Sequence, residues 1–134
     1  MSIEAINPPE LGRPSGFSHA VVATGGRLVF LAGQTAYDDS GSIAGADIVA
    51  QFERALGNLL TALRAAGGGP EHLVSLTIYA TDLANYRANG KQIGAVWRRL
   101  AGSQYPAMAA LGVAQLWDSE ALVEVQGFAV VPAG

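Results

Sequence analysis

The sequence predicts an α+β fold in which a mixed sheet carries two helices packed on one face. Two segments, 48–66 and 83–100, place apolar residues at three- and four-residue spacing, the period of an amphipathic helix. Five shorter segments have strand-like composition and surround the helices, at 20–24, 27–32, 73–80, 105–113 and 121–131. The predicted element order is therefore ββαβαββ.

The N-terminal part is predicted to be an arm followed by a hairpin. Residues 7–18 hold three of the six prolines, which indicates an irregular arm with turns. After the arm, Gly25 and Gly26 separate the strands 20–24 and 27–32, and glycine tolerates the positive φ angles of a two-residue turn. We expect these two strands to pair as an antiparallel hairpin.

Both predicted helices have recognisable features. Asp47 is a suitable N-cap for the first helix, and the run 67–70 (Gly-Gly-Gly-Pro) ends it. The second helix contains Gly90 and Gly94, each of which weakens a helix by about 1 kcal/mol relative to alanine. The stripes expected to be buried are Phe52, Leu56, Leu59, Leu60 and Leu63 in the first helix, and Tyr86, Ile93, Val96, Trp97 and Leu100 in the second.

The last strand carries one carboxylate, Glu124, among apolar neighbours. Strand side chains alternate between faces, so Glu124 shares a face with Gln126 and Phe128, while Val123 and Val125 take the other. A charged group on such a strand must reach solvent or find a partner. Glu124 is therefore either on an exposed sheet face or part of a functional site.

Length and composition limit the possible classes of protein. With 134 residues, of which half are hydrophobic, the chain is expected to form a single folded domain, residues 1–134. A net charge of -3 with scattered signs provides no basic surface, so we expect no nucleic-acid or membrane partner. The absence of cysteine excludes disulfides and thiol nucleophiles.

The sequence also supports expectations about location and assembly. Residues 1–4 lack the pattern of a signal peptide, and no apolar run reaches the roughly 18 residues of a membrane helix. We therefore expect a cytoplasmic protein. Its low charge implies exposed apolar surface, which favours self-association.

Common catalytic motifs are absent. The two histidines, His19 and His72, lie too far apart for a recognisable metal-ligand motif, and the glycines at 67–69 end a helix, whereas phosphate loops begin one. We expect no metal and no cofactor.

A looser set of polar residues remains as candidate chemistry. His19 is a possible general acid or base, because an imidazole can take up or release a proton near neutral pH, or a strand-edge histidine bonded to backbone. Arg13 can bind a carboxylate through two hydrogen bonds, or project into water. Gln34, where the second strand ends, and Glu124 complete the set.

Several short segments carry a family resemblance through their order and spacing. They are Gly-Phe-Ser-His-Ala at 16–20, Leu-Ala-Gly-Gln at 31–34, Ala-Leu-Gly-Asn-Leu at 55–59, Ala-Ala-Gly at 65–67, the strand and turn at 74–83, Tyr-Pro-Ala at 105–107 and Val-Glu-Val at 123–125. Together they resemble the reactive intermediate deaminase family (RidA/YjgF) over nearly the whole chain.

The resemblance implies a chorismate-mutase-like fold assembled as a homotrimer, with small-molecule sites in clefts between subunits. Deaminases of this family hydrolyse 2-imino and 2-enamino acids to 2-oxo acids and ammonia without a metal or organic cofactor. An arginine after Pro-Ala binds the substrate carboxylate, and a carboxylate on the last strand positions the attacking water.

This chain departs from the family pattern at several site positions. Met108 stands at the arginine position, and a thioether cannot pair with a carboxylate. Phe17 replaces a tyrosine, and Ala32 replaces a serine. The family's asparagine falls near Gly90, with Asn89 one position away.

Our first hypothesis is a diverged, cofactor-independent imine or enamine hydrolase. Glu124 would position water or transfer a proton, and His19 would assist. The residues expected to bind the substrate, in an apolar cleft suited to a neutral or aromatic ligand, are Arg13, Phe17, Ala32, Gly33, Gln34, Asn89, Met108 and Ala110.

Two alternatives stay open from the sequence. A non-catalytic trimer would bind a small molecule or a protein partner in the same clefts. A ribonuclease-like role fits poorly with the acidic net charge.

Overall fold

The computed structural model describes residues 1–134 and contains two sheets, three α-helices and two 3-10 turns. The elements in chain order are β1 (Ser2–Ile6), η1 (Pro9–Leu11), β2 (Ala20–Thr24), β3 (Arg27–Gln34), α1 (Ile48–Ala65), η2 (Pro70–His72), β4 (Leu73–Ala80), α2 (Leu83–Ala88), α3 (Gly90–Ala101), β5 (Ala107–Gly112) and β6 (Val123–Val131). None of the three helices has the length and apolar character needed to cross a bilayer.

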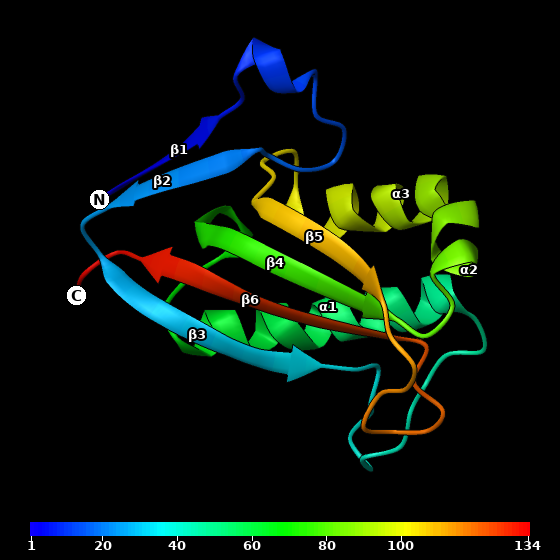
Figure 1. Cartoon of the computed structure of the whole chain (residues 1–134). Helices are drawn as coiled ribbons and strands as arrows, with labels where there is room; N and C mark the ends of the chain where they lie inside the picture. Colours follow the sequence, from blue (N-terminus) through cyan, green and yellow to red (C-terminus); the bar gives the residue numbers. More distant parts are fainter.

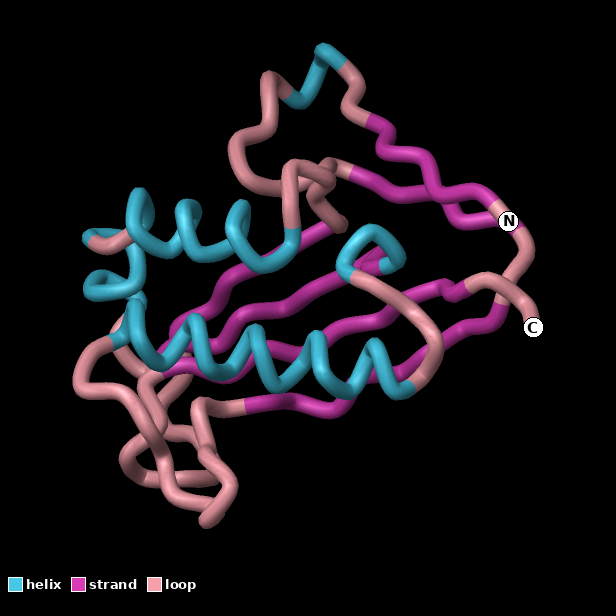
Figure 2. Tube along the Cα trace, turned by 180° about the vertical axis from the view of Figure 1, so that it is seen from behind, coloured by secondary structure: helices cyan, strands magenta, loops and turns pink.

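The central sheet has four strands in the order β3-β6-β4-β5. β6 pairs antiparallel with β3 and β4, while β4 and β5 are parallel, so the sheet is mixed. The helices lie on one face of it (Figure 2), and the other face has no helical cover (Figure 1). The predicted α+β class with a mixed sheet and helices on one face is confirmed.

α1 provides the centre of the hydrophobic core. Its predicted stripe is at most 1% exposed, and it packs against β3, β6 and α3. The N-cap is the predicted Asp47, whose carboxylate accepts a hydrogen bond from the Ala50 N–H at 2.8 Å. In β6, Val123 and Val125 are buried beneath α1, whereas Gln126 and Phe128 are exposed on the open face, as the alternation predicted.

The predicted hairpin between segments 20–24 and 27–32, which correspond to β2 and β3, is wrong. β2 pairs instead with the N-terminal strand β1, which sequence reasoning missed, and β3 pairs with β6. Gly25 and Gly26 do have positive φ angles, of 74° and 78°, but they form a corner from which β2 and β3 diverge (Figure 1). Turn chemistry is local, whereas the choice of pairing partner depends on strands that are distant in sequence.

The predicted second helix is two helices. α2 ends at Ala88, and α3 begins at Gly90. The side chain of Asn89 turns back and donates to the carbonyl and the side-chain oxygen of Asn85, at 2.9 and 3.0 Å, so a side chain competes with helical backbone bonding at the break. The buried face still follows the prediction, because Ile93, Val96 and Trp97 are buried and Tyr86 and Leu100 are half-buried.

Gln51 fastens the loop before β6 to α1. Its side chain is 3% exposed, and its amide nitrogen donates to the carbonyls of Gly45 and Glu120, each at 3.2 Å. Its amide oxygen accepts from the Leu122 N–H at 2.8 Å. One side chain thus bonds three backbone groups on two loops and fixes where β6 begins.

Replacement of Gln51 by leucine (Gln51→Leu) should lower the free energy of unfolding by about 3 kcal/mol, because three backbone groups lose their partner. Gln92→Leu, at an exposed position of α3, is the matched control and should change it by less than about 0.5 kcal/mol. Chemical denaturation measures both. Equal effects of the two substitutions would refute the role given to Gln51.

Candidate functional site

Glu124 lies over Gly33, at an irregularity in the pairing of β3 with β6. The register between these strands shifts between Leu31 and Gln34, which marks a β-bulge. A Cβ atom on Gly33 would collide with Oε2 of Glu124, so the carboxylate rests directly on the backbone of β3. Bulges are frequent beside active sites because they re-aim side chains. Sequence reasoning expected both residues in the site but not the bulge that joins them.

The Glu124 carboxylate is half-buried and forms no hydrogen bond or ion pair within the chain. Its cross-strand neighbour Tyr79 directs its hydroxyl elsewhere and donates to Gln126 at 3.0 Å. The carboxylate therefore keeps its lone pairs free for a water molecule or a ligand.

The loop after β3 is anchored next to this carboxylate. The Tyr37 hydroxyl donates to Gln34, and Asn58 of α1 donates to the carbonyls of Thr35 and Tyr37 at 3.0 and 3.1 Å. Thr35 in turn donates to Asp118 at 3.3 Å. Gln34 was a predicted site residue, and Asn58 belongs to the family-like segment 55–59. Thr35, Tyr37 and Asp118 were not singled out from the sequence, because each is polar but unremarkable in its local context.

A second group of predicted residues meets at the edge of β5. Phe17, Met108 and Ala110 line a hollow of about 310 Å³ together with Gly16, Ile78, Tyr86 and Ala109. No charged side chain lines it. Burial raises the pKa of the Tyr86 phenol from its ordinary value of 10.0 to about 12, so this group stays neutral even in mildly alkaline solution.

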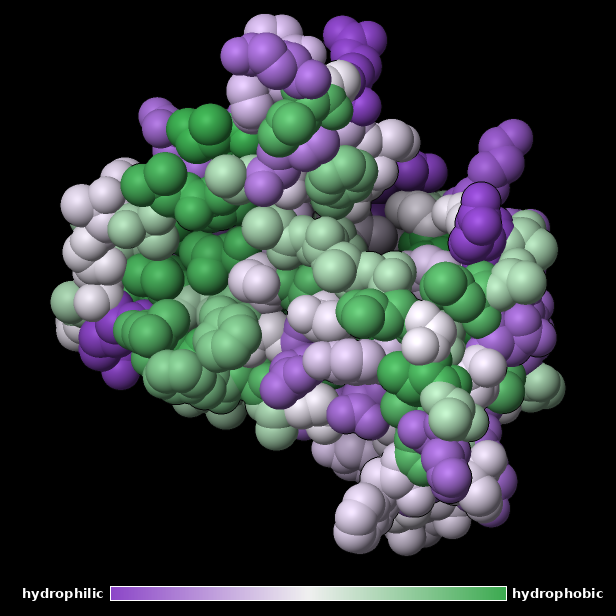
Figure 3. Space-filling view, viewed as in Figure 1, coloured by the Kyte–Doolittle hydropathy of each residue, from purple (hydrophilic) through white to green (hydrophobic).

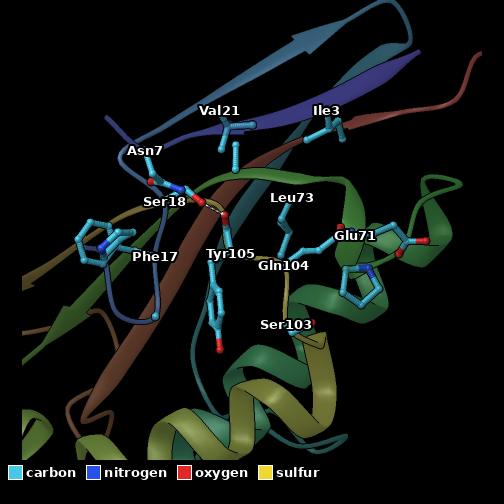
Figure 4. Close-up of a pocket in the computed structure, with 14 residues that line it drawn as sticks. Ile3, Asn7, Phe17, Ser18, Val21, Glu71, Leu73, Ser103, Gln104 and Tyr105 are labelled. Atoms are coloured by element: carbon cyan, nitrogen blue, oxygen red, sulfur yellow. Dashed lines mark hydrogen bonds between the residues drawn. The ribbon is translucent and has the colours of Figure 1, made fainter. Parts of the chain in front are cut away.

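The N-terminal arm is fastened to the start of β5 through Ser18. The Ser18 N–H donates to the Pro106 carbonyl at 3.0 Å, and its hydroxyl donates to the Tyr105 carbonyl at 2.6 Å. Figure 4 shows this contact in a hollow of about 400 Å³ between β1–β2 and the rest of the chain. The ring of Tyr105 extends from there toward α3. Ser18 thereby fixes the neighbouring Phe17 against β5.

His19 belongs to the arm and not to the Glu124 group. Its backbone N–H donates to the Asn7 side chain at 2.8 Å, and its ring Nε2 lies 3.1 Å from the Gly12 carbonyl. Ser18, beside it, pairs with Ala107 on the outer side of β5, three strand spacings from β6. The spacing between strands and the rise per residue then place Ser18 roughly 14 Å from Glu124 across the strands and roughly 13 Å from it along them. One chain alone does not bring the two predicted catalytic residues together.

The remaining predicted residues are dispersed. Ala32 lies on β3 with the Glu124 group, so it does not join Phe17 and Met108 in one hollow. Arg13 is exposed on the arm and forms no ion pair, and Asn89 is engaged with Asn85. No group of three or more histidine, aspartate or glutamate side chains is arranged to hold a metal ion.

The fold and this divided site define a class of protein, and comparison with known proteins identifies it. The family described as Endoribonuclease L-PSP matches residues 10–131. The chain belongs to this family, which is also known by the names YjgF, RidA and RutC.

Individual relatives agree over nearly the full length. The chain is 32% identical to protein DfrA of Myxococcus xanthus over 132 residues, 97% of each chain. The structure of YyfB from Yersinia pestis, of the conserved Rid protein family, superposes with a TM-score of 0.86 at 34% identity, over 98% of this chain and 100% of that one. RidA from an Antarctic Psychrobacter matches with a TM-score of 0.69 at 26% identity, over 90% and 92%. The predicted family is confirmed.

Gly33→Ala should destabilise the protein by up to about 1 kcal/mol, because the new methyl group forces the flexible, half-buried Glu124 carboxylate to move aside. In a Glu124→Ala background the same substitution should cost much less, since the colliding atom is gone, and a double-mutant cycle measures this coupling. Gly57→Ala is the control, because nothing lies within 4 Å of its Cβ position inside α1, and it should stabilise by up to about 1 kcal/mol. Additive effects of Gly33→Ala and Glu124→Ala would contradict the contact.

Proposed function

We propose that the protein is a RidA-like hydrolase that acts on an imine, an enamine or a related small metabolite without a cofactor. The observation that carries this proposal is the unpaired Glu124 carboxylate, held over Gly33 at the bulge of β3. A carboxylate without an internal partner is available as a proton acceptor.

In the proposed reaction, water adds to the carbon of the C=N bond, and Glu124 passes one proton of that water to the nitrogen, which gives a carbinolamine. Glu124 then passes the hydroxyl proton of the carbinolamine to the nitrogen, so that ammonia leaves and a carbonyl product remains. An enamine first takes a proton on carbon and reacts as the imine. Water is the only other reactant that the overall reaction consumes.

Met108 argues against the usual 2-imino acid as the substrate at this position. The hollow beside Phe17 and Met108 contains no cation, so the part of a ligand that lies there must be neutral. Leaving a carboxylate there without a cationic partner would cost several kcal/mol. The alternative function is a non-catalytic assembly that binds a small molecule or protein partner in the same clefts.

The deciding measurement is ammonia release, by a coupled assay, from freshly generated 2-aminoacrylate and from a larger neutral imine. We expect release from the neutral imine, a loss of about 100-fold or more in Glu124→Ala, and little release from 2-aminoacrylate. Release from 2-aminoacrylate that is lost in the variant would overturn the argument from Met108. Binding of the neutral compound without any ammonia from either would support the non-catalytic alternative.

We further propose that the protein assembles as a homotrimer through the open sheet face. This face displays Leu28, Phe30 and Phe128, which are 58%, 71% and 39% exposed, and apolar side chains gather on the same side in Figure 3. The Phe30 and Phe128 rings contact each other edge to face at 5.4 Å. In such an assembly the Glu124 group of one subunit can complete a cleft with the Phe17 group of the next.

Light scattering after size exclusion should give a mass three times the 13.8 kDa of one chain. Phe30→Asp should shift the mass toward one chain, because it places a charge in the proposed interface. Leu11→Asp, at a residue 62% exposed on the arm, should leave it unchanged. A monomeric wild type would refute both the assembly and the shared cleft.

A further inference from the structure

A larger hollow of about 680 Å³ runs along α3, on the side of β5 that carries Met108. It shares Gly16, Tyr86 and Met108 with the hollow beside Phe17, and it does not include Glu124. Nothing in the proposed hydrolysis uses it.

The charges around this hollow all have one sign. Lys91 and Arg98 line it, and no carboxylate does. Neither cation takes part in an ion pair, since the salt bridges of the chain join Arg54 to Asp39 and Arg99 to Glu53. A Cβ atom on Gly94 would lie 3.5 Å from Nη1 of Arg98, so the guanidinium folds back along α3 beside the hollow. The side chain of Asn89 does not cap α3, whose positive N-terminal end lies at Gly90 and Lys91.

Two glycines keep the helical wall of the hollow bare. Gly90, Gly94 and Arg98 follow at four-residue spacing and share one face of α3. A Cβ on Gly90 would meet nothing within 4 Å, and on Gly94 it would meet only Arg98, so packing within the chain does not require either glycine. Glycine weakens a helix relative to alanine, and here its effect is to leave room above the helix.

The aromatic residues Trp97 and Tyr105 line the same hollow. Trp97 is 4% exposed, and its Nε1 is the one buried side-chain polar atom of the chain without a hydrogen-bond partner. Its ring stacks on Tyr105, with centroids 6.0 Å apart. The two rings give the hollow an aromatic wall.

We propose that this hollow binds a small carboxylate that carries an aromatic or branched apolar body. The carboxylate lies between Lys91 and Arg98, where charge-assisted hydrogen bonds hold it. The apolar body packs against the lining formed by Trp97, Tyr86 and Met108. The site supplies from α3 the positive charge that Met108 does not supply from β5. It does not depend on Glu124 or on catalysis.

The test uses Trp97 as its own reporter. In a Trp117→Phe background, which removes the 96% exposed second tryptophan, titration with 3-phenylpropanoate should change the Trp97 fluorescence to saturation. The uncharged 3-phenylpropanamide should bind about tenfold or more weakly, because it lacks the charge that the cations recognise. The double variant Lys91→Ala, Arg98→Ala should bind 3-phenylpropanoate about tenfold or more weakly than the wild type. Arg64→Ala, which removes a cation outside this hollow, should leave the affinity unchanged.

Two further variants test whether the acid binds in this hollow or at the Glu124 site. Gly94→Leu fills the hollow and should abolish binding while the thermal unfolding midpoint stays the same or rises. Glu124→Gln should bind like the wild type, whether or not ammonia release survives. Equal affinity for acid and amide, unchanged affinity in the double cation variant, or the absence of a saturable response would overturn the proposal. A change of oligomeric mass in the double variant would overturn it too, and would identify the hollow as an interface between copies.

Discussion

The burial of α1 against one face of the sheet is the constraint on which the rest of the structure depends. Its leucine stripe covers β3 and β6 and leaves essentially no exposed area of its own. The inner face of each strand therefore packs in the core, and the outer face has no helical cover. Glu124, Phe30 and Phe128 occupy that outer face, so the candidate carboxylate and the proposed subunit interface follow from the same one-sided packing.

Backbone features close to this core position the candidate chemistry. The bulge in β3 brings Gly33 under Glu124, and Gln51 fixes the loop from which β6 starts. Gly33 acts through its bare backbone and Gln51 through its side-chain amide, and neither belongs to a catalytic motif. The carboxylate is consequently held on rigid strands while its oxygen atoms stay free, which is the arrangement that a proton acceptor needs.

The arm and α3 form a separate region around Met108. Ser18 fastens the arm to β5, and the glycines of α3 leave an open wall opposite. The two cations that line the hollow, Lys91 and Arg98, belong to α3. The Glu124 carboxylate lies on β6, which is on the other side of β4 from β5. The region around Met108 therefore carries two cations and is not uniformly apolar.

The sequence by itself determined the elements whose signals are local and periodic. The 3.6-residue period of 48–66, its Asp47 cap and the alternation around Glu124 predicted α1 and β6 closely, because these patterns depend only on which side chains face the core. Only the tertiary structure decided the partner of β2, the break at Asn89, the contact of Glu124 with Gly33 and the separation of Glu124 from His19. The break at Asn89 comes from a local side-chain hydrogen bond to Asn85, which the apolar period does not report. The other features depend on contacts between residues far apart in the chain, and such contacts leave no period in the sequence that would reveal them.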